Sequence, residues 1–320
     1  VKHRTGRVQP GRLAPGGRRD LPRPGRRRLR PERRRAYLRS SPRMKIRIAR
    51  SAGVFRGVRR AVEIARVTAG DERGTVYTNG PLIHNPQALE KLRSEGVVPL
   101  SDAQPVPAAP VIVRAHGVPP ETRVRLDREA TRVVDATCPK VSTIQQKIAD
   151  FSARGYAVVI SGDADHPEVV GLLGYASGPA HVVSDPGEVD GLPPLERVLL
   201  VAQTTQDEEI FEEVRRRILA RFPGAEALST ICQSTHRRQS EVRDMAAKVD
   251  AMVVIGGRNS ANTCRLAEIC RHLGTPAHHV ETAAELPLED LCRLDRVGVT
   301  AGASTPSDII EQVLARLRGA

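Results

Sequence analysis

The sequence is poor in aromatic residues and has no long apolar run. It contains no Trp, and only four Phe and four Tyr among 320 residues. Proteins that bind single-stranded nucleic acid stack bases on aromatic side chains, so this scarcity weakens that function class. No stretch approaches the roughly 20 apolar residues of a transmembrane helix, and no secretory signal is visible. We therefore expect a cytoplasmic protein without a membrane partner.

Cysteine is also scarce. The chain has five cysteines, an odd number without a secretory signal, which indicates thiols or metal ligands rather than a disulfide framework. Cys270 and Cys292 lie in apolar helical patterns, and we expect both to be buried core residues. Cys264 follows a loop rich in polar residues, but it has no clear direction of approach to a metal. Cys138 and Cys232 therefore remain the candidate ligands.

The net charge of +13 suggests a nucleic-acid partner, but the charge is concentrated in one segment. Residues 1–43 carry 16 of the 50 Lys and Arg with only two acidic residues, whereas residues 44–320 carry 34 basic and 35 acidic residues. We expect 1–43 to be a disordered basic extension, because it has few apolar residues to bury. We also expect translation to begin at Met44. The alternative is a basic arm that binds nucleic acid.

From Met44 onward, short β-branched runs alternate with longer helical patterns, which is typical of an α/β protein with parallel sheets. Most strand runs are fully apolar, as expected where helices cover both faces of a sheet. Strands are predicted at residues 45–49, 75–77, 111–114, 133–135, 157–161, 198–201, 251–255 and 297–300. Helices are predicted at residues 57–68, 86–94, 121–130, 140–153, 207–221, 236–248, 261–272 and 307–318.

Three junctions between a predicted strand and a predicted helix recur at near-even spacing. Phe55 occupies the first, Cys138 follows 83 residues later, and Cys232 follows after a further 94. The spacing suggests three similar units that each offer one group to a shared centre, with domains at residues 44–137, 138–231 and 232–320. A centre of three thiolates is typical of an iron–sulfur cluster that leaves one iron open for chemistry. Phenylalanine, however, offers iron no lone pair.

Five predicted strands are followed by polar motifs. These are Ala115-His116-Gly117, Asp165-His166-Pro167-Glu168, Gln203-Thr204-Thr205, Arg258-Asn259-Ser260-Ala261-Asn262 and Ala301-Gly302-Ala303-Ser304. Ligands of parallel sheets gather at the carboxyl ends of the strands, so these motifs are expected to form one site.

Two kinds of chemistry are expected at this site. The segment from Ser260 to Asn262 opens a helix, whose free N–H groups suit a phosphate, although a plain helix cap is the alternative. His84, His116 and Ser304 are candidate donors to the same anion. Glu168 is the carboxylate best placed to pass a proton, with Thr204, to a leaving oxygen. The alternative for Glu168 is a surface residue favoured by the helix dipole.

Together these motifs resemble the 4-hydroxy-3-methylbut-2-enyl diphosphate reductases of the methylerythritol phosphate route to isoprenoids. The resemblance runs from Met44 to about Leu317, with six motifs in order. It implies three α/β domains with small parallel sheets in a cloverleaf around a central cavity, and a [4Fe–4S] cluster held by one cysteine from each domain. It also implies reductive loss of a hydroxyl from an allylic diphosphate, giving isopentenyl and dimethylallyl diphosphates, with electrons from a ferredoxin or flavodoxin.

The resemblance also assigns roles to residues by position. Cluster ligands would be Cys138 and Cys232, and the catalytic residues would be Glu168, His166 and Thr204. Substrate would be held by His84, His116, His166, Thr204, Thr205, Ser260, Ala261, Asn262 and Ser304.

Two positions depart from the family pattern. Phe55 stands where the family has its first cluster cysteine, so the resemblance implies a labile or incomplete cluster and weak turnover or none. Ala261 replaces a serine, which removes one hydrogen bond to the diphosphate. One alternative is a working reductase, with a substitute ligand such as Cys264 or with a sequence error at positions 54–56. The others are a diphosphate-binding relative without catalysis, and a nucleic-acid protein that acts through residues 1–43.

Overall fold

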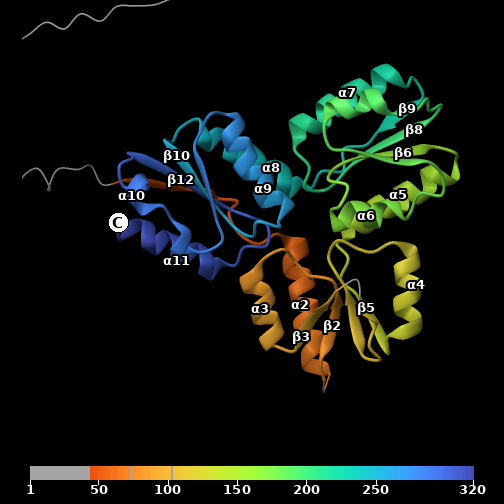
Figure 1. Cartoon of the computed structure of the whole chain (residues 1–320), viewed down its shortest axis with the longest axis horizontal. Helices are drawn as coiled ribbons and strands as arrows, with labels where there is room; N and C mark the ends of the chain where they lie inside the picture. Colours follow the sequence, from red (N-terminus) through yellow and green to blue (C-terminus); the bar gives the residue numbers. More distant parts are fainter. Residues whose placement is uncertain (1–43, 73, 102–103) are drawn as a thin grey trace, which may run out of the picture. The chain divides into compact units, whose positions relative to one another are not determined.

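Three parallel four-stranded sheets form in the described part of the chain, each with its own helices (Figure 1). The structure is a computed structural model that describes residues 44–72, 74–101 and 104–320. The expectations of a disordered, untranslated or nucleic-acid-binding extension concern residues 1–43, which lie outside the described residues. The α/β class with small parallel sheets, predicted from the alternation of patterns, is confirmed.

The first lobe is built on the sheet with strand order β3-β2-β4-β5. Its elements are β2 (Val76–Asn79), β3 (Val97–Leu100), β4 (Pro110–Val113), β5 (Arg132–Asp135), α2 (Arg56–Asp71), α3 (Pro86–Ser94) and α4 (Pro120–Glu129). Ala61 and Ala65, one turn apart on α2, are fully buried against this sheet. Proline stands at the first turn of α3 and α4, where its missing N–H costs no helical hydrogen bond.

The second lobe has the strand order β7-β6-β8-β9. Its elements are β6 (Ala157–Ser161), β7 (Ala180–Val183), β8 (Val198–Ala202), β9 (Ala225–Ala227), α5 (Pro139–Ala153), α6 (Pro167–Leu173), α7 (Glu208–Arg221) and a 3-10 helix (Pro186–Gly191). Every residue of β6 and β8 is buried, which confirms that helices cover both faces of these strands.

The third lobe has the strand order β1-β12-β10-β11. Its elements are β1 (Lys45–Ile48), β10 (Ala251–Ile255), β11 (Ala277–Val280), β12 (Arg296–Ala301), α8 (Gln233–Ala246), α9 (Ala261–His272), α10 (Leu288–Leu291), α11 (Ser307–Arg318) and a 3-10 helix (Ala283–Glu285). The sequence analysis put residues 45–49 in the first domain, but β1 pairs with β12 in this sheet. Lys45 of β1 lies opposite Arg296 of β12, 251 residues later in the chain, and a pairing over such a distance leaves no local signal in the sequence.

All eight predicted strands are present, and the four that the patterns missed are β3, β7, β9 and β11. Each lies at an edge of its sheet. Edge strands pair on one side only, and the short sequences of β7, β9 and β11 each contain a polar residue that interrupts the apolar run. β3 is apolar but contains Pro99, which weakens a strand prediction. The patterns also missed α6 and α10, which have only seven and four residues.

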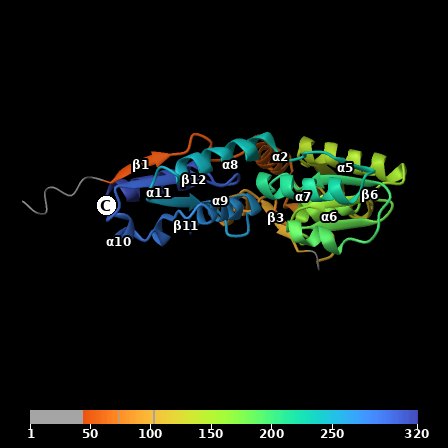
Figure 2. The ribbon, with the colours of Figure 1, turned by 90° about the horizontal axis from the view of Figure 1, so that it is seen from above.

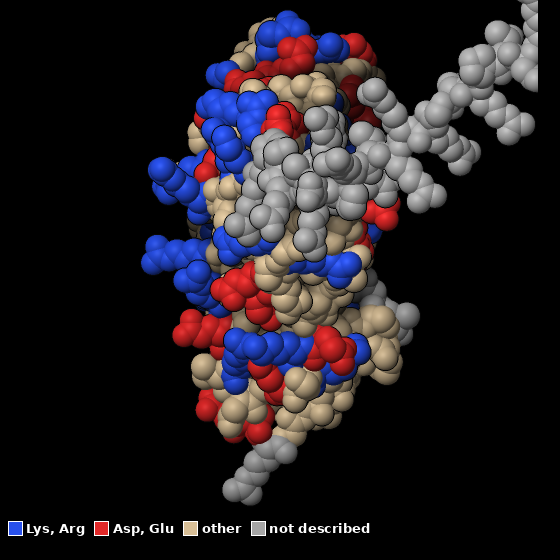
Figure 3. Space-filling model, turned by 90° about the vertical axis from the view of Figure 1, so that its left-hand side faces the viewer, with Lys and Arg blue, Asp and Glu red and all other residues tan. Residues whose placement is uncertain are grey.

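No helix in the described ranges is both long and apolar enough to cross a membrane. On the face drawn in Figure 3, Lys and Arg project along one edge, with Asp and Glu interspersed among them. This mixture agrees with the near-equal numbers of basic and acidic residues in 44–320.

Candidate active site

A cavity of about 650 Å³ lies among the three lobes. All the residues that the sequence analysis singled out for binding, catalysis or metal ligation line it: Phe55, His84, His116, Cys138, His166, Glu168, Thr204, Thr205, Cys232, Ser260, Ala261, Asn262 and Ser304. The structure thus brings the whole predicted set together, while the role of each residue stays a prediction.

The three strand-to-helix junctions have the same local geometry. Phe55, Cys138 and Cys232 are the extended N-cap residues of α2, α5 and α8, and these three helices lie along the same side of the sheets (Figure 2). Each backbone N–H donates to a carbonyl oxygen two residues past the end of β12, β4 or β8: Phe55 to Ala303 at 2.9 Å, Cys138 to Ala115 at 2.9 Å and Cys232 to Thr204 at 3.0 Å. Each junction therefore ties its helix to the neighbouring lobe.

The two thiols at these junctions are half-buried and open to the cavity. Gly57, in the first turn of α2, lies against Cys138, and a Cβ at Gly57 would come 2.9 Å from the Cys138 Sγ. The Cys232 Sγ lies 3.6 Å from the Ser234 Oγ. A side chain at position 57 would therefore push against the thiol, which glycine avoids.

Phe55 at the third junction packs on a buried cation. The guanidinium carbon of Arg238, on α8, lies 4.3 Å from the centre of the Phe55 ring. Arg238 is only 2% exposed, and it donates to the carbonyl oxygens of Ala301, Gly53 and Ser51. Burial lowers the pKa of Arg238 to about 10, which still leaves it protonated at neutral pH. Arg238 therefore holds the loop that carries residue 55.

The cluster that the resemblance implies needs three thiolates from the protein. Two thiols and one aromatic ring stand at the three junctions, and an aromatic ring cannot replace a thiolate on iron. The residues present do not fit a [4Fe–4S] cluster of the three-cysteine type. The geometry of the junctions is retained, but one ligand is missing.

Three imidazoles form a second feature of the cavity, which we name the histidine cluster (His84, His116 and His166). Their ring centres lie 4.7 to 5.7 Å apart. Burial, followed by the charges of the neighbouring rings and Arg114, lowers the pKa of His166 to about 3 and holds the pKa of His116 well below its usual range. Burial and Arg114 also lower the pKa of His84. The cluster is therefore neutral at physiological pH.

The histidine cluster suits an anion better than a metal ion, although its ring nitrogens lie within 4.8 Å of one another. The Nδ1 of His166 accepts a hydrogen bond from the Glu168 N–H at 3.1 Å, so its proton is on Nε2. The protonated Nε2 can donate a hydrogen bond but has no lone pair to offer a metal ion. His84 Nε2 and His116 Nδ1 are buried and have no hydrogen-bond partner among the described residues, so both nitrogens are available to a bound ligand.

The start of α9 completes the anion site. The Ser260 side chain caps this helix, and both amide atoms of Asn262 are buried without a partner in the described part of the chain. The Ser304 hydroxyl donates to the His84 carbonyl oxygen at 3.0 Å, which joins the first and third lobes. Free N–H groups and the helix dipole at this end favour a bound phosphate group.

Glu168 is the buried acid of the site. Its carboxylate accepts from the Thr204 N–H and from the Thr204 hydroxyl, both at 2.6 Å. Burial raises the pKa of Glu168, and the two hydrogen bonds from Thr204 oppose this shift. The sequence alternative of an exposed Glu is wrong, because Glu168 is 3% exposed. A buried carboxyl with a raised pKa can hold and deliver a proton.

Three residues near the site were not predicted from the sequence, and three cysteines lie outside the cavity. Arg60 and Lys140 line the cavity one turn or less into their helices, and Arg238 lies behind Phe55, with no motif to mark them. Cys264 does not line the cavity, and its thiol donates to the Arg258 carbonyl oxygen. Cys270 is buried as expected, but Cys292 is exposed at the end of α10, so that prediction was wrong.

Known proteins match most of the chain. The family model described as LytB protein matches residues 46–318. A 4-hydroxy-3-methylbut-2-enyl diphosphate reductase of Geobacter sulfurreducens is 44% identical over 86% of this chain and 97% of its own length. A 4-hydroxy-3-methylbut-2-enyl diphosphate reductase of Aquifex aeolicus is 42% identical over 85% of this chain and 95% of its own length.

Two solved structures are also similar. One of (E)-4-hydroxy-3-methyl-but-2-enyl diphosphate reductase is 42% identical, covers 87% of this chain and 100% of that one, and has a TM-score of 0.63. The structure of the E-1-hydroxy-2-methyl-but-2-enyl-4-diphosphate reductase from Plasmodium falciparum is 25% identical, covers 86% of this chain and 88% of that one, and has a TM-score of 0.82. The three-lobed fold described above is thus shared with these reductases.

Proposed function

This chain belongs to the LytB protein family, and on that premise we propose that it reduces 4-hydroxy-3-methylbut-2-enyl diphosphate to isopentenyl and dimethylallyl diphosphates. The observation that carries the proposal is one cavity that combines unpartnered anion donors with a buried acid. An allylic diphosphate needs donors for its phosphates and a proton for its leaving hydroxyl, and the cavity offers both.

The diphosphate is held at the histidine cluster and at the start of α9. The neutral imidazoles donate hydrogen bonds, with Ser260, Asn262 and Ser304 around them, and the backbone N–H of Ala261 takes part where the family serine is absent. Thr205 lies beside Thr204 on the same wall. Burial of an anion against these groups raises the pKa values of the imidazoles, so binding takes up protons.

Glu168 delivers the proton. Thr204 lies between this carboxyl and the hydroxyl region of the substrate, and its own hydroxyl is already bonded to Glu168 at 2.6 Å. A protonated Glu168 passes its proton through Thr204 to the departing oxygen, which leaves as water when the C–O bond breaks. The two electrons would come from the external ferredoxin or flavodoxin that the resemblance implies, and the second proton from solvent. His166 orients the start of α6 by accepting from the Glu168 N–H.

The supply of electrons depends on a cluster site that has lost one ligand. The resemblance implies a [4Fe–4S] cluster and a ferredoxin or flavodoxin, but Phe55 stands in place of one cluster cysteine. We expect low turnover from the chain as it stands. The same residue favours a second candidate function, a diphosphate-binding relative that no longer catalyses.

Both candidates are tested by one anaerobic experiment. The chain is treated with iron, sulfide and a reduced dye, and the two products are measured by mass spectrometry, with inorganic diphosphate binding measured by calorimetry. Glu168→Gln is expected to lower turnover by about 10²- to 10⁴-fold with little change in diphosphate affinity. Glu212→Gln, an exposed acid on α7, is the matched control.

Three outcomes are distinguished. Product formation that depends on Glu168 supports the reductase. Diphosphate binding without product supports the non-catalytic relative. Absence of diphosphate binding contradicts both.

A further inference from the structure

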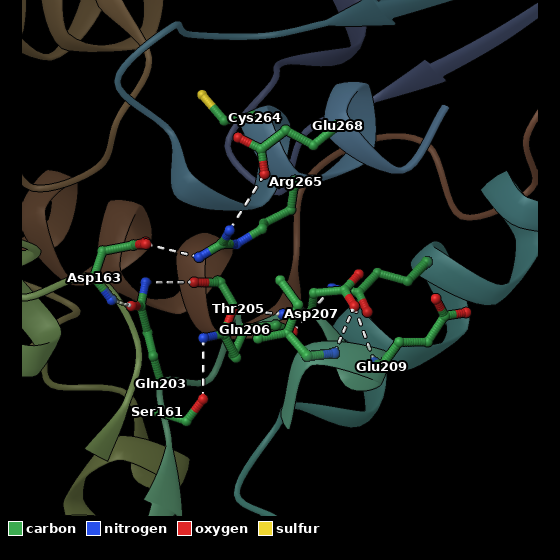
Figure 4. A network of polar contacts seen from close by, with 12 residues as sticks. Ser161, Asp163, Gln203, Thr205, Gln206, Asp207, Glu209, Cys264, Arg265 and Glu268 are labelled. Atoms are coloured by element: carbon green, nitrogen blue, oxygen red, sulfur yellow. Dashed lines mark hydrogen bonds and ion pairs between the residues drawn. The ribbon is translucent and has the colours of Figure 1, made fainter. Parts of the chain in front are cut away.

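One ion pair joins a helix and a loop that border the anion site from different lobes. Arg265 lies on α9, three residues after Asn262, and Asp163 follows β6, three residues before His166. The Arg265 Nη2 lies 2.7 Å from the Asp163 Oδ1, and the Arg265 side chain is only 14% exposed. Figure 4 shows Arg265 reaching across to Asp163. The pair therefore joins the second and third lobes beside the histidine cluster.

Asp163 is also connected to the cavity wall. Its backbone N–H donates to the Gln203 side chain at 2.9 Å, and the Gln203 amide donates to the Thr205 hydroxyl at 2.8 Å (Figure 4). Gln203 is 1% exposed, so these hydrogen bonds are shielded from water. Movement of Asp163 would therefore also move the loop that carries Thr204 and Thr205.

Other contacts between these two lobes lie near the chain connection. Arg243 pairs with Asp207 at 2.8 Å, and the Gln239 amide donates to the Gln206 carbonyl oxygen at 3.0 Å. They join the start of α7 to α8, which the chain itself links through residues 222–232. Asp163 and Arg265 are instead 102 residues apart. Loss of this pair would remove a direct polar contact between α9 and the second lobe, while the α7–α8 contacts and the packing of α9 against α8 remain.

We propose that the Asp163–Arg265 ion pair is a latch that keeps α9 against the second lobe and so closes the diphosphate site. Neither residue lines the cavity, so both act as positioning residues. The donors of the site come from both sides of the latch, with His166 on one and Ser260 and Asn262 on the other. When the latch opens, these donors separate and cannot bind one diphosphate together. The role in binding rests on the proposed function.

Single substitutions separate a latch from a simple effect of charge. Asp163→Asn removes a negative charge near the site, and Arg265→Gln removes a positive one. If the residues acted only through their electric field, Asp163→Asn would strengthen binding of an anion and Arg265→Gln would weaken it. A latch requires both variants to weaken binding, because each breaks the same pair.

The binding arm of the test uses calorimetry with inorganic diphosphate on the full chain. Each single variant is expected to bind about fivefold more weakly, and the double variant no more weakly than either single one. Arg296→Gln is the control, because Arg296 pairs with Asp250 at 2.9 Å within the third lobe. Unchanged or tighter binding by Asp163→Asn overturns the latch.

The second arm needs no ligand. Amide hydrogen exchange is measured in the free protein at residues 260–263 and 163–168. Both variants are expected to raise exchange there about fivefold, and Arg296→Gln is expected to leave it unchanged. Unchanged exchange in both variants refutes the latch. If the unmodified chain fails to bind diphosphate, the proposed function is contradicted. The hydrogen-exchange measurement still tests whether the ion pair holds α9 against the second lobe.

Discussion

Replacement of Phe55 by Cys is the sharpest perturbation that the structure offers. The Phe55 ring is partly buried and lies 4.3 Å from the Arg238 guanidinium. Truncation of a fully buried Phe costs about 3–5 kcal/mol, and a cation–π contact contributes about 1 kcal/mol of this. For a half-buried ring we expect Phe55→Cys to lower the free energy of unfolding by about 1–2 kcal/mol. The melting temperature of the metal-free protein should fall by about 3–6 °C.

When iron and sulfide are supplied, Phe55→Cys should instead raise the free energy of unfolding. The junction geometry at residue 55 matches that of Cys138 and Cys232, so a thiol there completes a three-thiolate donor set. A cluster that binds the folded chain alone stabilises it by mass action. We expect the variant to hold more iron and sulfide per chain, melt higher than its metal-free form, and gain turnover.

The measurement is a count of iron and sulfide per chain after anaerobic reconstitution, with thermal unfolding before and after. Phe55→Ser is the matched control, since it removes the same ring and adds no thiolate. The reasoning is refuted if the unmodified chain already carries as much cluster as Phe55→Cys, or if Phe55→Ser gains as much.

Three further predictions follow from single contacts. Gly57→Ala places a methyl group 2.9 Å from the Cys138 Sγ, so thermal unfolding should show a loss of about 1–2 kcal/mol, and an unchanged melting temperature would contradict this. Arg238→Met leaves three carbonyl oxygens without their donor and should cost about 3–5 kcal/mol in denaturant unfolding. A change under 1 kcal/mol would show that Arg238 does not hold the loop. Burial keeps the pKa values of the histidine cluster low in the free protein, and a bound diphosphate raises them. Affinity should therefore rise as pH falls through the bound-state pKa values, and above them it should level off at the lower value given by the neutral imidazoles. Calorimetry in buffers of different ionisation enthalpy should detect proton uptake, and zero uptake would sink this prediction.

The sequence by itself predicted the fold class and the candidate site for the same physical reason. Central strands such as β6, β8 and β10 are buried on both faces, so they must be continuously apolar, and that run is visible without a structure. Polar motifs that follow such strands come together because parallel strands end at one edge of a sheet. Each of the five motifs contributes at least one residue to the cavity lining: His116, His166, Glu168, Thr204, Ser260 and Ser304 are among them.

Only the tertiary structure decided which distant segments meet. The placement of β1 beside β12, the Arg238 guanidinium under Phe55 and the contact of Asp163 with Arg265 each join residues more than 100 positions apart. Local patterns record whether a segment is apolar, polar or helical, because those properties depend on neighbours along the chain. They carry no information on which partner a strand edge or a charged side chain finds, because that choice is made by packing across the whole molecule.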